Sequence, residues 1–212
     1  GSVYLRNKLT LNYSDRSEIL NNDGLPAIWD TRNVNIVQSG NKVYSNIFTN
    51  GFYSYVSTLS GSVSYSPENF AFLFTGSNGQ LKTDTEAVYI ANEEIEFSFW
   101  VKLTLEHNST NYPGSQKIMT LGPSDNSTNA SISLTSTGIE LEYNNSACVL
   151  SNTVTLSENT WYHVHSLFCG HNTQPSTSNC FLRLNDNPLT VTQVGSTTTD
   201  YDGASNSLNA HV

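Results

Sequence analysis

Hydrophobic and polar positions alternate most regularly over Ile95–Leu103, which reads IEFSFWVKL. The odd-numbered positions are all apolar, whereas the even-numbered positions carry Glu96, Ser98, Trp100 and Lys102. A period of two places the first set on one face of a strand and the second set on the other. The stretch 159–168 (NTWYHVHSLF) is similar, and we expect both to be strands around one core.

Shorter runs of the same kind recur along the chain, separated by Gly, Pro and Asn. The predicted strands are 3–11, 34–37, 42–48, 52–59, 70–75, 116–121, 130–135, 139–143, 154–156, 181–184 and 189–194. Asn50-Gly51 stands between two aromatic runs and predicts a hairpin. No segment keeps a helical period beyond one turn, so the pattern predicts an all-β sandwich or barrel.

Composition narrows the choice of partners. The 212 residues suit a single all-β domain over 1–212, and the net charge is −9 with only 9 Lys and Arg. Nucleic acid and anionic membranes are therefore unfavourable partners, because phosphate binding needs clustered cations. No apolar run approaches the roughly 18 residues of a membrane-spanning helix.

Three cysteines are present, at positions 148, 169 and 180. Cys169 ends one apolar run and Cys180 begins the next, with a polar loop between them. If those runs form a hairpin, the two sulfurs lie at the base of the loop and can form a disulfide. Such a bond would add about 2–3 kcal/mol of stability. Cys148 is then either a buried free thiol or an intermolecular link.

Five N-x-[ST] sequons favour an extracellular location. Their asparagines are Asn12, Asn108, Asn126, Asn129 and Asn144. Four of the five lie between 108 and 146, so we expect that region to be an exposed surface if it is glycosylated.

From 70 to 194 the order of motifs resembles the laminin-G-like, concanavalin-A-like jelly roll. Phe97-Ser98-Phe99-Trp100-Val101-Lys102 is similar to the family's φ-S-φ-W-φ-K strand, where φ is apolar. Residues 159–164 resemble its N-x-W-Y-H-V element, and 72–76, 118–122 and 182–185 resemble three further family strands. Asp186 stands where the family usually has Gly. The resemblance implies an antiparallel two-sheet jelly-roll sandwich, with 1–65 as N-terminal strands of the same domain.

The chain departs from the family at its closing strand, which usually reads G-x-φ-D-D-φ-R-φ-Y. Residues 208–212 (LNAHV) do not match it. Three explanations are open: the N-terminal strand takes the place of this closing strand, a partner supplies it, or the chain was cut. A missing strand would leave an open sheet edge, so self-association by β-strand addition is one hypothesis.

Catalysis is not expected. Some glucanases of this fold use closely spaced carboxylates, and the nearest match is Glu94 and Glu96, which lack the required third acid. We interpret both as solvent-side residues. His163 and His165 share a strand face and could chelate a metal, but without a third ligand nearby they predict ordinary sheet-face packing.

The resemblance implies Ca²⁺ at a loop rim, with Asp125 and Asp200 as candidate ligands and Asp84 and Asp202 as further ones. These aspartates equally suit ordinary turns. For a glycan, the loop residues of suitable chemistry are Asn111, Tyr112, Asn126, Tyr201 and Asp202. The alternative is that the tyrosines are ordinary surface residues.

The sequence thus predicts a non-enzymatic extracellular recognition or adhesion module that binds glycan or protein surfaces at a cell or particle surface. The alternative is a structural subunit of an extracellular filament or viral surface assembly.

Overall fold

The chain is described by a computed structural model. It describes residues 3–6, 36–39, 42–46, 54–66, 68–69, 71–74, 80–83, 94–104, 116–122, 130–144, 147–170, 173–198 and 207–211. Within these ranges all regular structure is β, as the polarity pattern predicted. Every strand pairing among them is antiparallel, as the resemblance implied. The described residues include no helix long and apolar enough to span a membrane.

The strands form two sheets. The first has seven strands in the order β15-β14-β13-β8-β1-β6-β5. Their bounds are Asn187–Pro188, Phe181–Leu184, Trp161–Phe168, Ile95–Leu103, Val3–Arg6, Ala71–Phe74 and Val63–Ser66.

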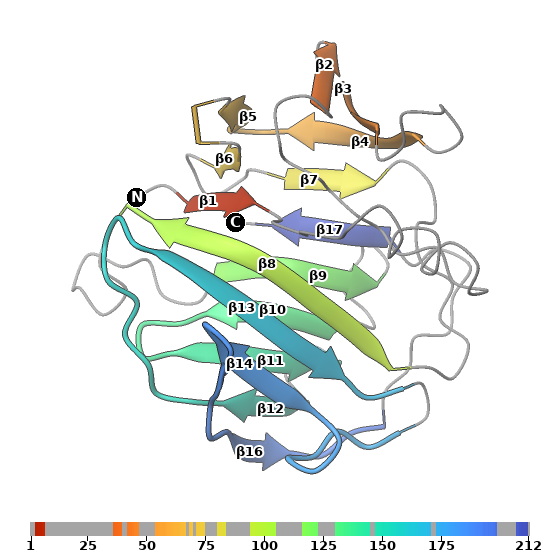
Figure 1. The fold of residues 1–212 in the computed structure, drawn as a ribbon. Coiled ribbons are helices and arrows are strands. Elements are labelled where there is room, and N and C mark those ends of the chain that lie inside the picture. The colour runs from red at the N-terminus through yellow and green to blue at the C-terminus, as the bar shows by residue number, and fades with distance from the viewer. Residues whose placement is uncertain are drawn as a thin grey trace, which may run out of the picture.

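The second sheet has ten strands in the order β16-β12-β11-β10-β9-β17-β7-β4-β3-β2. Their bounds are Thr192–Gly195, Cys148–Ser151, Ile139–Tyr143, Ala130–Leu134, Gln116–Gly122, Ser207–His211, Gln80–Thr83, Ser54–Ser60, Lys42–Asn46 and Ile36–Ser39. In Figure 1 the long strands β8 and β13 cross in front of β9 and β10, so these parts of the two sheets form two layers.

Strands β8 and β13 pair along their whole shared length, from Trp161↔Lys102 to Phe168↔Ile95. Phe99, Val101 and Leu103 of β8 are buried, as the alternation predicted. On β13 the buried positions are Val164, Ser166 and Phe168, so the intervening residues of both strands face outward.

The core lies between the sheets and takes side chains from both. The Tyr143 ring of β11 packs edge-on against the Phe168 ring of β13, with centroids 5.3 Å apart. Ile118, Ile132, Leu141 and Leu150 of the larger sheet are also fully buried. Each such side chain contributes about 1.5–3 kcal/mol through its burial.

The predicted strands at Ile95–Leu103, Ile139–Tyr143 and Phe181–Leu184 are confirmed at those bounds. The predicted strand at 154–156 is wrong. Asn152 donates to the Ile139 carbonyl through both its backbone N (3.4 Å) and its Nδ2 (2.7 Å), and the segment that follows leaves the ladder. On its side away from β10, strand β11 pairs with β12, which the sequence did not predict.

Both terminal strands are internal to their sheets. Strand β1 pairs with β8 on one side and β6 on the other. Strand β17 pairs with β9 and β7, although the polar tail was not expected to form a strand. The segments that begin and end the described chain therefore each connect two parts of a sheet.

Candidate functional site

The outward side of β8, β13 and β14 carries a cluster of partly or fully exposed aromatic and charged side chains. We call this surface the histidine face. It comprises Glu96, Ser98, Trp100, Lys102, Trp161, His163, His165, Phe181 and Arg183. Strand alternation positions it, because the residues between these positions are the buried core residues of the same strands.

Four rings form a continuous row across the three strands. Trp100 and His163 lie directly opposite each other, with ring centroids 5.2 Å apart. The His163 and His165 rings are stacked at 6.3 Å. His165 meets Phe181 edge-on at 4.9 Å. All four side chains are partly exposed, so the row presents ring surface to solvent.

Two cations lie over rings of this face. Lys102 Nζ is 5.1 Å from the centroid of the Trp161 ring, directly across from it in the β8–β13 register. Arg183 Cζ is 4.7 Å from the Phe181 centroid. Cation–π contacts of this kind contribute about 0.5–1 kcal/mol at exposed sites. They hold the two cations beside the aromatic row.

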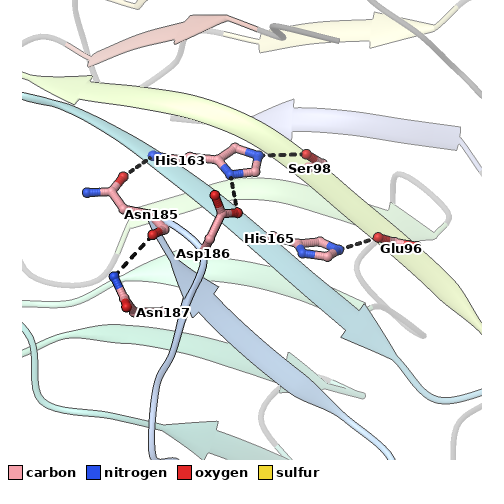
Figure 2. Close-up of polar contacts among 7 residues, drawn as sticks. All are labelled: Glu96, Ser98, His163, His165, Asn185, Asp186 and Asn187. Atoms are coloured by element: carbon pink, nitrogen blue, oxygen red, sulfur yellow. Dashed lines mark hydrogen bonds and ion pairs between the residues drawn. The ribbon is translucent and has the colours of Figure 1, made fainter. Parts of the chain in front are cut away.

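His163 is fixed by the turn between β14 and β15. Asn185 and Asp186 have φ of 50° and 66°, the positive values that a two-residue hairpin turn requires. Asn185 Oδ1 accepts from the His163 backbone N at 2.8 Å, and Asn185 N donates to the His163 carbonyl at 2.8 Å. Figure 2 shows the result, in which the His163 ring lies between Ser98 and Asp186.

Ser98, His163 and Asp186 therefore make a serine–histidine–aspartate contact series. Ser98 Oγ is 2.8 Å from His163 Nε2, and His163 Nδ1 is 3.5 Å from Asp186 Oδ1. Two features weigh against acyl transfer. The Asp186 side chain is 87% exposed, and strand N–H groups point within the sheet plane, away from a carbonyl placed over Ser98.

His165 makes the second polar contact of the face, between its Nε2 and Glu96 Oε1 (Figure 2). Its side chain is 17% exposed and that of Glu96 is 60% exposed. The prediction that Glu96 lies on the solvent side is confirmed.

The outward side of the larger sheet carries a different cluster. Glu142 Oε2 accepts from Ser131 Oγ and Ser133 Oγ, both at 3.0 Å, and lies 3.9 Å from Lys117 Nζ. Burial, and next the charge of Glu142, raise the pKa of Glu140 on the same strand. The two hydroxyl donors and the Lys117 ammonium satisfy the Glu142 carboxylate, so these mutual contacts explain the cluster.

The sequence-predicted ligand residues all lie outside the part of the chain that the structure describes. Asn111, Tyr112, Asn126, Tyr201 and Asp202 lie outside the described residues, as do the aspartates at 84, 125 and 200. Those predictions remain predictions. Within the described ranges no three His, Cys, Asp or Glu side chains are grouped as metal ligands would be.

One sequon asparagine is described. Asn144 Nδ2 donates to Thr197 Oγ1 and to the Thr198 carbonyl, both at 2.8 Å. A glycan on this nitrogen would replace one of the two contacts. The other four sequon asparagines lie outside the described residues.

Cys169 and Cys180 lie at the base of the β13–β14 hairpin, as the sequence predicted for a hairpin there. Both are present as buried thiols, with Cys169 Sγ donating to the Thr173 carbonyl at 3.7 Å and Cys180 Sγ lying 3.0 Å from Tyr143 Oη. Cys148 is also a buried thiol.

The sequence analysis did not select Trp161, Phe181 and Arg183. The available signal was that the outward positions of two adjacent predicted strands, 159–168 and Ile95–Leu103, both carry aromatic residues.

No family model and no curated protein matches this chain.

Proposed function

We propose that this protein is a non-enzymatic extracellular recognition module, with the two sheets forming a laminin-G-like jelly-roll sandwich, and that the histidine face binds glycan. The row of partly exposed rings from Trp100 to Phe181 carries the proposal. The C–H faces of a sugar stack on rings, while its hydroxyls need polar partners at the margins. Lys102, Arg183 and Glu96 supply such partners.

A glycan array followed by titration of the bound saccharide tests this proposal. Trp100→Ala and Phe181→Ala should each weaken binding by about tenfold or more, equivalent to ~1.4 kcal/mol. Val194→Ala is the matched control, because Val194 is 64% exposed on β16 of the other sheet. Circular dichroism of each variant checks that it is folded.

The proposal fails if no saccharide binds at millimolar concentration, or if Trp100→Ala and Phe181→Ala bind as well as Val194→Ala does. Incubation with a fluorophosphonate tests the non-enzymatic part, since this probe labels activated serines. We expect Ser98 to stay unlabelled. Labelling that disappears in His163→Ala would instead show that the serine is activated.

One observation favours a structural subunit as the second candidate. Strand β16 is at the edge of the larger sheet, and its Val194 side chain is the exposed large hydrophobic residue among those described. An edge strand with an exposed apolar residue can pair with another chain. Fibres seen by electron microscopy, and lost in Val194→Lys, would support that role, while fibre-free protein across the tested concentrations would exclude it.

A further inference from the structure

The three thiols lie in the core, apart from the histidine face. Cys169 follows β13 and Cys180 precedes β14, whereas Cys148 is the first residue of β12 in the other sheet. Their exposures are 1%, 6% and 0%, respectively. Cys169 and Cys180 flank the loop that joins β13 to β14, so both side chains lie at the base of this hairpin. Cys169 Sγ donates to the Thr173 carbonyl at 3.7 Å, which favours its protonated form.

The surroundings of Cys180 favour its thiolate. Tyr143 Oη, which comes from the opposite sheet, is 3.0 Å from Cys180 Sγ. The hydrogen bond from Cys169 is the largest cause that lowers the pKa of Cys180 to about 6, and Tyr143 adds to it. Burial opposes the shift, and Asn179 Oδ1 at 3.3 Å favours the protonated thiol.

The other two cysteines behave in the opposite way. The contact with Cys180, followed by burial, raises the pKa of Cys169, which therefore keeps its proton. Burial also raises the pKa of Cys148. Thiolates are the nucleophilic form, so the three buried cysteines differ in reactivity.

We propose that Cys180 is the site at which a peroxide oxidises this protein, and that Cys169 then resolves the product into an intramolecular disulfide. This modification does not depend on the proposed glycan-binding function. In the oxidised protein this disulfide links the two ends of the loop between β13 and β14. Cys148 stays reduced.

The reaction balances with a peroxide as the oxidant. The Cys180 thiolate attacks one peroxide oxygen, the O–O bond breaks, and the leaving hydroxide takes a proton to form water. The resulting sulfenic acid is attacked by the Cys169 sulfur. The S–O bond breaks as the S–S bond forms, and the hydroxyl leaves with the Cys169 proton as a second water. Two electrons pass from the two sulfurs to the peroxide.

The test begins with the folded protein, reduced and freed of reductant, then treated with hydrogen peroxide and mapped by mass spectrometry. We expect one cross-linked pair, Cys169–Cys180, with Cys148 still alkylatable after denaturation. The oxidation rate should change by less than about twofold between pH 7 and pH 9. An ordinary thiol would gain about tenfold per pH unit over the lower part of this range.

Serine variants separate the roles. Cys169→Ser should stop at the sulfenic acid of Cys180, which dimedone traps, and Cys180→Ser should slow oxidation of Cys169 by about tenfold or more. Cys148→Ser is the control and should react as the native protein does. If Cys169→Ser or Cys180→Ser fails to fold, the proposal is still tested on the native chain. The pH profile of its oxidation rate and its cross-link map then decide whether the proposal holds.

Three results would overturn the proposal. The first is a cross-link that includes Cys148 or a second molecule. The second is a native oxidation rate that rises steeply between pH 7 and pH 9. The third is unchanged oxidation of Cys169 in folded Cys180→Ser.

Discussion

Tyr143 shows how one residue can serve both packing and chemistry. Its ring is fully buried against Phe168, while its hydroxyl reaches Cys180 Sγ from the opposite sheet. The same hydroxyl is one cause of the lowered pKa of that thiol. A change confined to the hydroxyl therefore separates the two effects.

Tyr143→Phe should cost about 0.5–1.5 kcal/mol of unfolding free energy and raise the pKa of Cys180. The first effect is measured by urea denaturation and the second by the pH dependence of iodoacetamide alkylation. Tyr162→Phe is the control, because the Tyr162 hydroxyl accepts only from the exposed Ser157 N–H at 3.0 Å among the contacts described. Equal effects of the two variants on Cys180 alkylation would contradict a role of the Tyr143 hydroxyl in lowering the pKa of Cys180.

Glu140 gives a pH-dependent prediction at the same scale. Burial, and next the charge of Glu142, raise its pKa above the ordinary 4.5, so the folded state favours the protonated side chain. Stability from such a group is complete below its unfolded pKa and is lost as the pH rises through its folded pKa. Glu140→Gln should therefore stabilise the protein at pH 7, by about 0.5 kcal/mol, and leave it unchanged at pH 3.

Urea denaturation at both pH values measures the effect of Glu140→Gln. Glu158→Gln, at an exposed position between strands, should show no comparable gain at pH 7. An equal gain at pH 3 and pH 7 would rule out removal of the carboxylate charge as its cause.

At the scale of elements, the sequence predicted the strand with the longest alternation and some short apolar runs such as Phe181–Leu184, but it missed short strands that are rich in polar residues. Ile95–Leu103 has the longest alternation and was located at its true bounds. Strands β5, β7 and β12 have four residues each and include Ser, Gln or Lys, so their pairing depends on neighbours that are distant in sequence.

The candidate site illustrates the same limit. Alternation predicted that Glu96 is outward and that His163 and His165 share one face of their strand. It could not predict the register Trp100↔His163, because register depends on how two strands slide past each other. Without that register, the aromatic row and the placement of His163 beside Ser98 could not be inferred.

The turn between β10 and β11 provides an element-scale prediction. A Cβ added to Gly138 would lie 1.8 Å from the Asn152 carbonyl oxygen, so the backbone of one segment would have to move. Gly138→Ala should cost about 1–3 kcal/mol or more, because overpacking against backbone is not relieved by side-chain rotation.

Thermal unfolding measures the effect of Gly138→Ala. The control is Thr137→Ala in the same turn, where the exposed side chain should allow a change within about 0.5 kcal/mol. Similar melting temperatures for both variants would show that the Gly138–Asn152 approach is not a constraint.

At the scale of the whole molecule, the shared core joins the two sheets into one cooperative unit. Phe168→Ala removes a fully buried ring from their interface and should cost about 3–5 kcal/mol. Phe181→Ala, at a partly exposed position on the histidine face, should cost much less. Urea denaturation followed by fluorescence and by circular dichroism checks both the costs and the single transition. Two separate transitions in the native protein would contradict a shared core.

The internal positions of β1 and β17 have a consequence for synthesis on the ribosome. Strand β1 is made first but must pair with β6 and β8, and β17 is made after every other described strand yet joins β7 to β9. Contacts so distant in sequence fold slowly. A nascent chain that has not yet exposed residues 207–211 therefore has a divided larger sheet, with β7 and β9 unpaired on the sides that face β17. Until residues 207–211 emerge, these two strand edges are open templates for pairing with other chains.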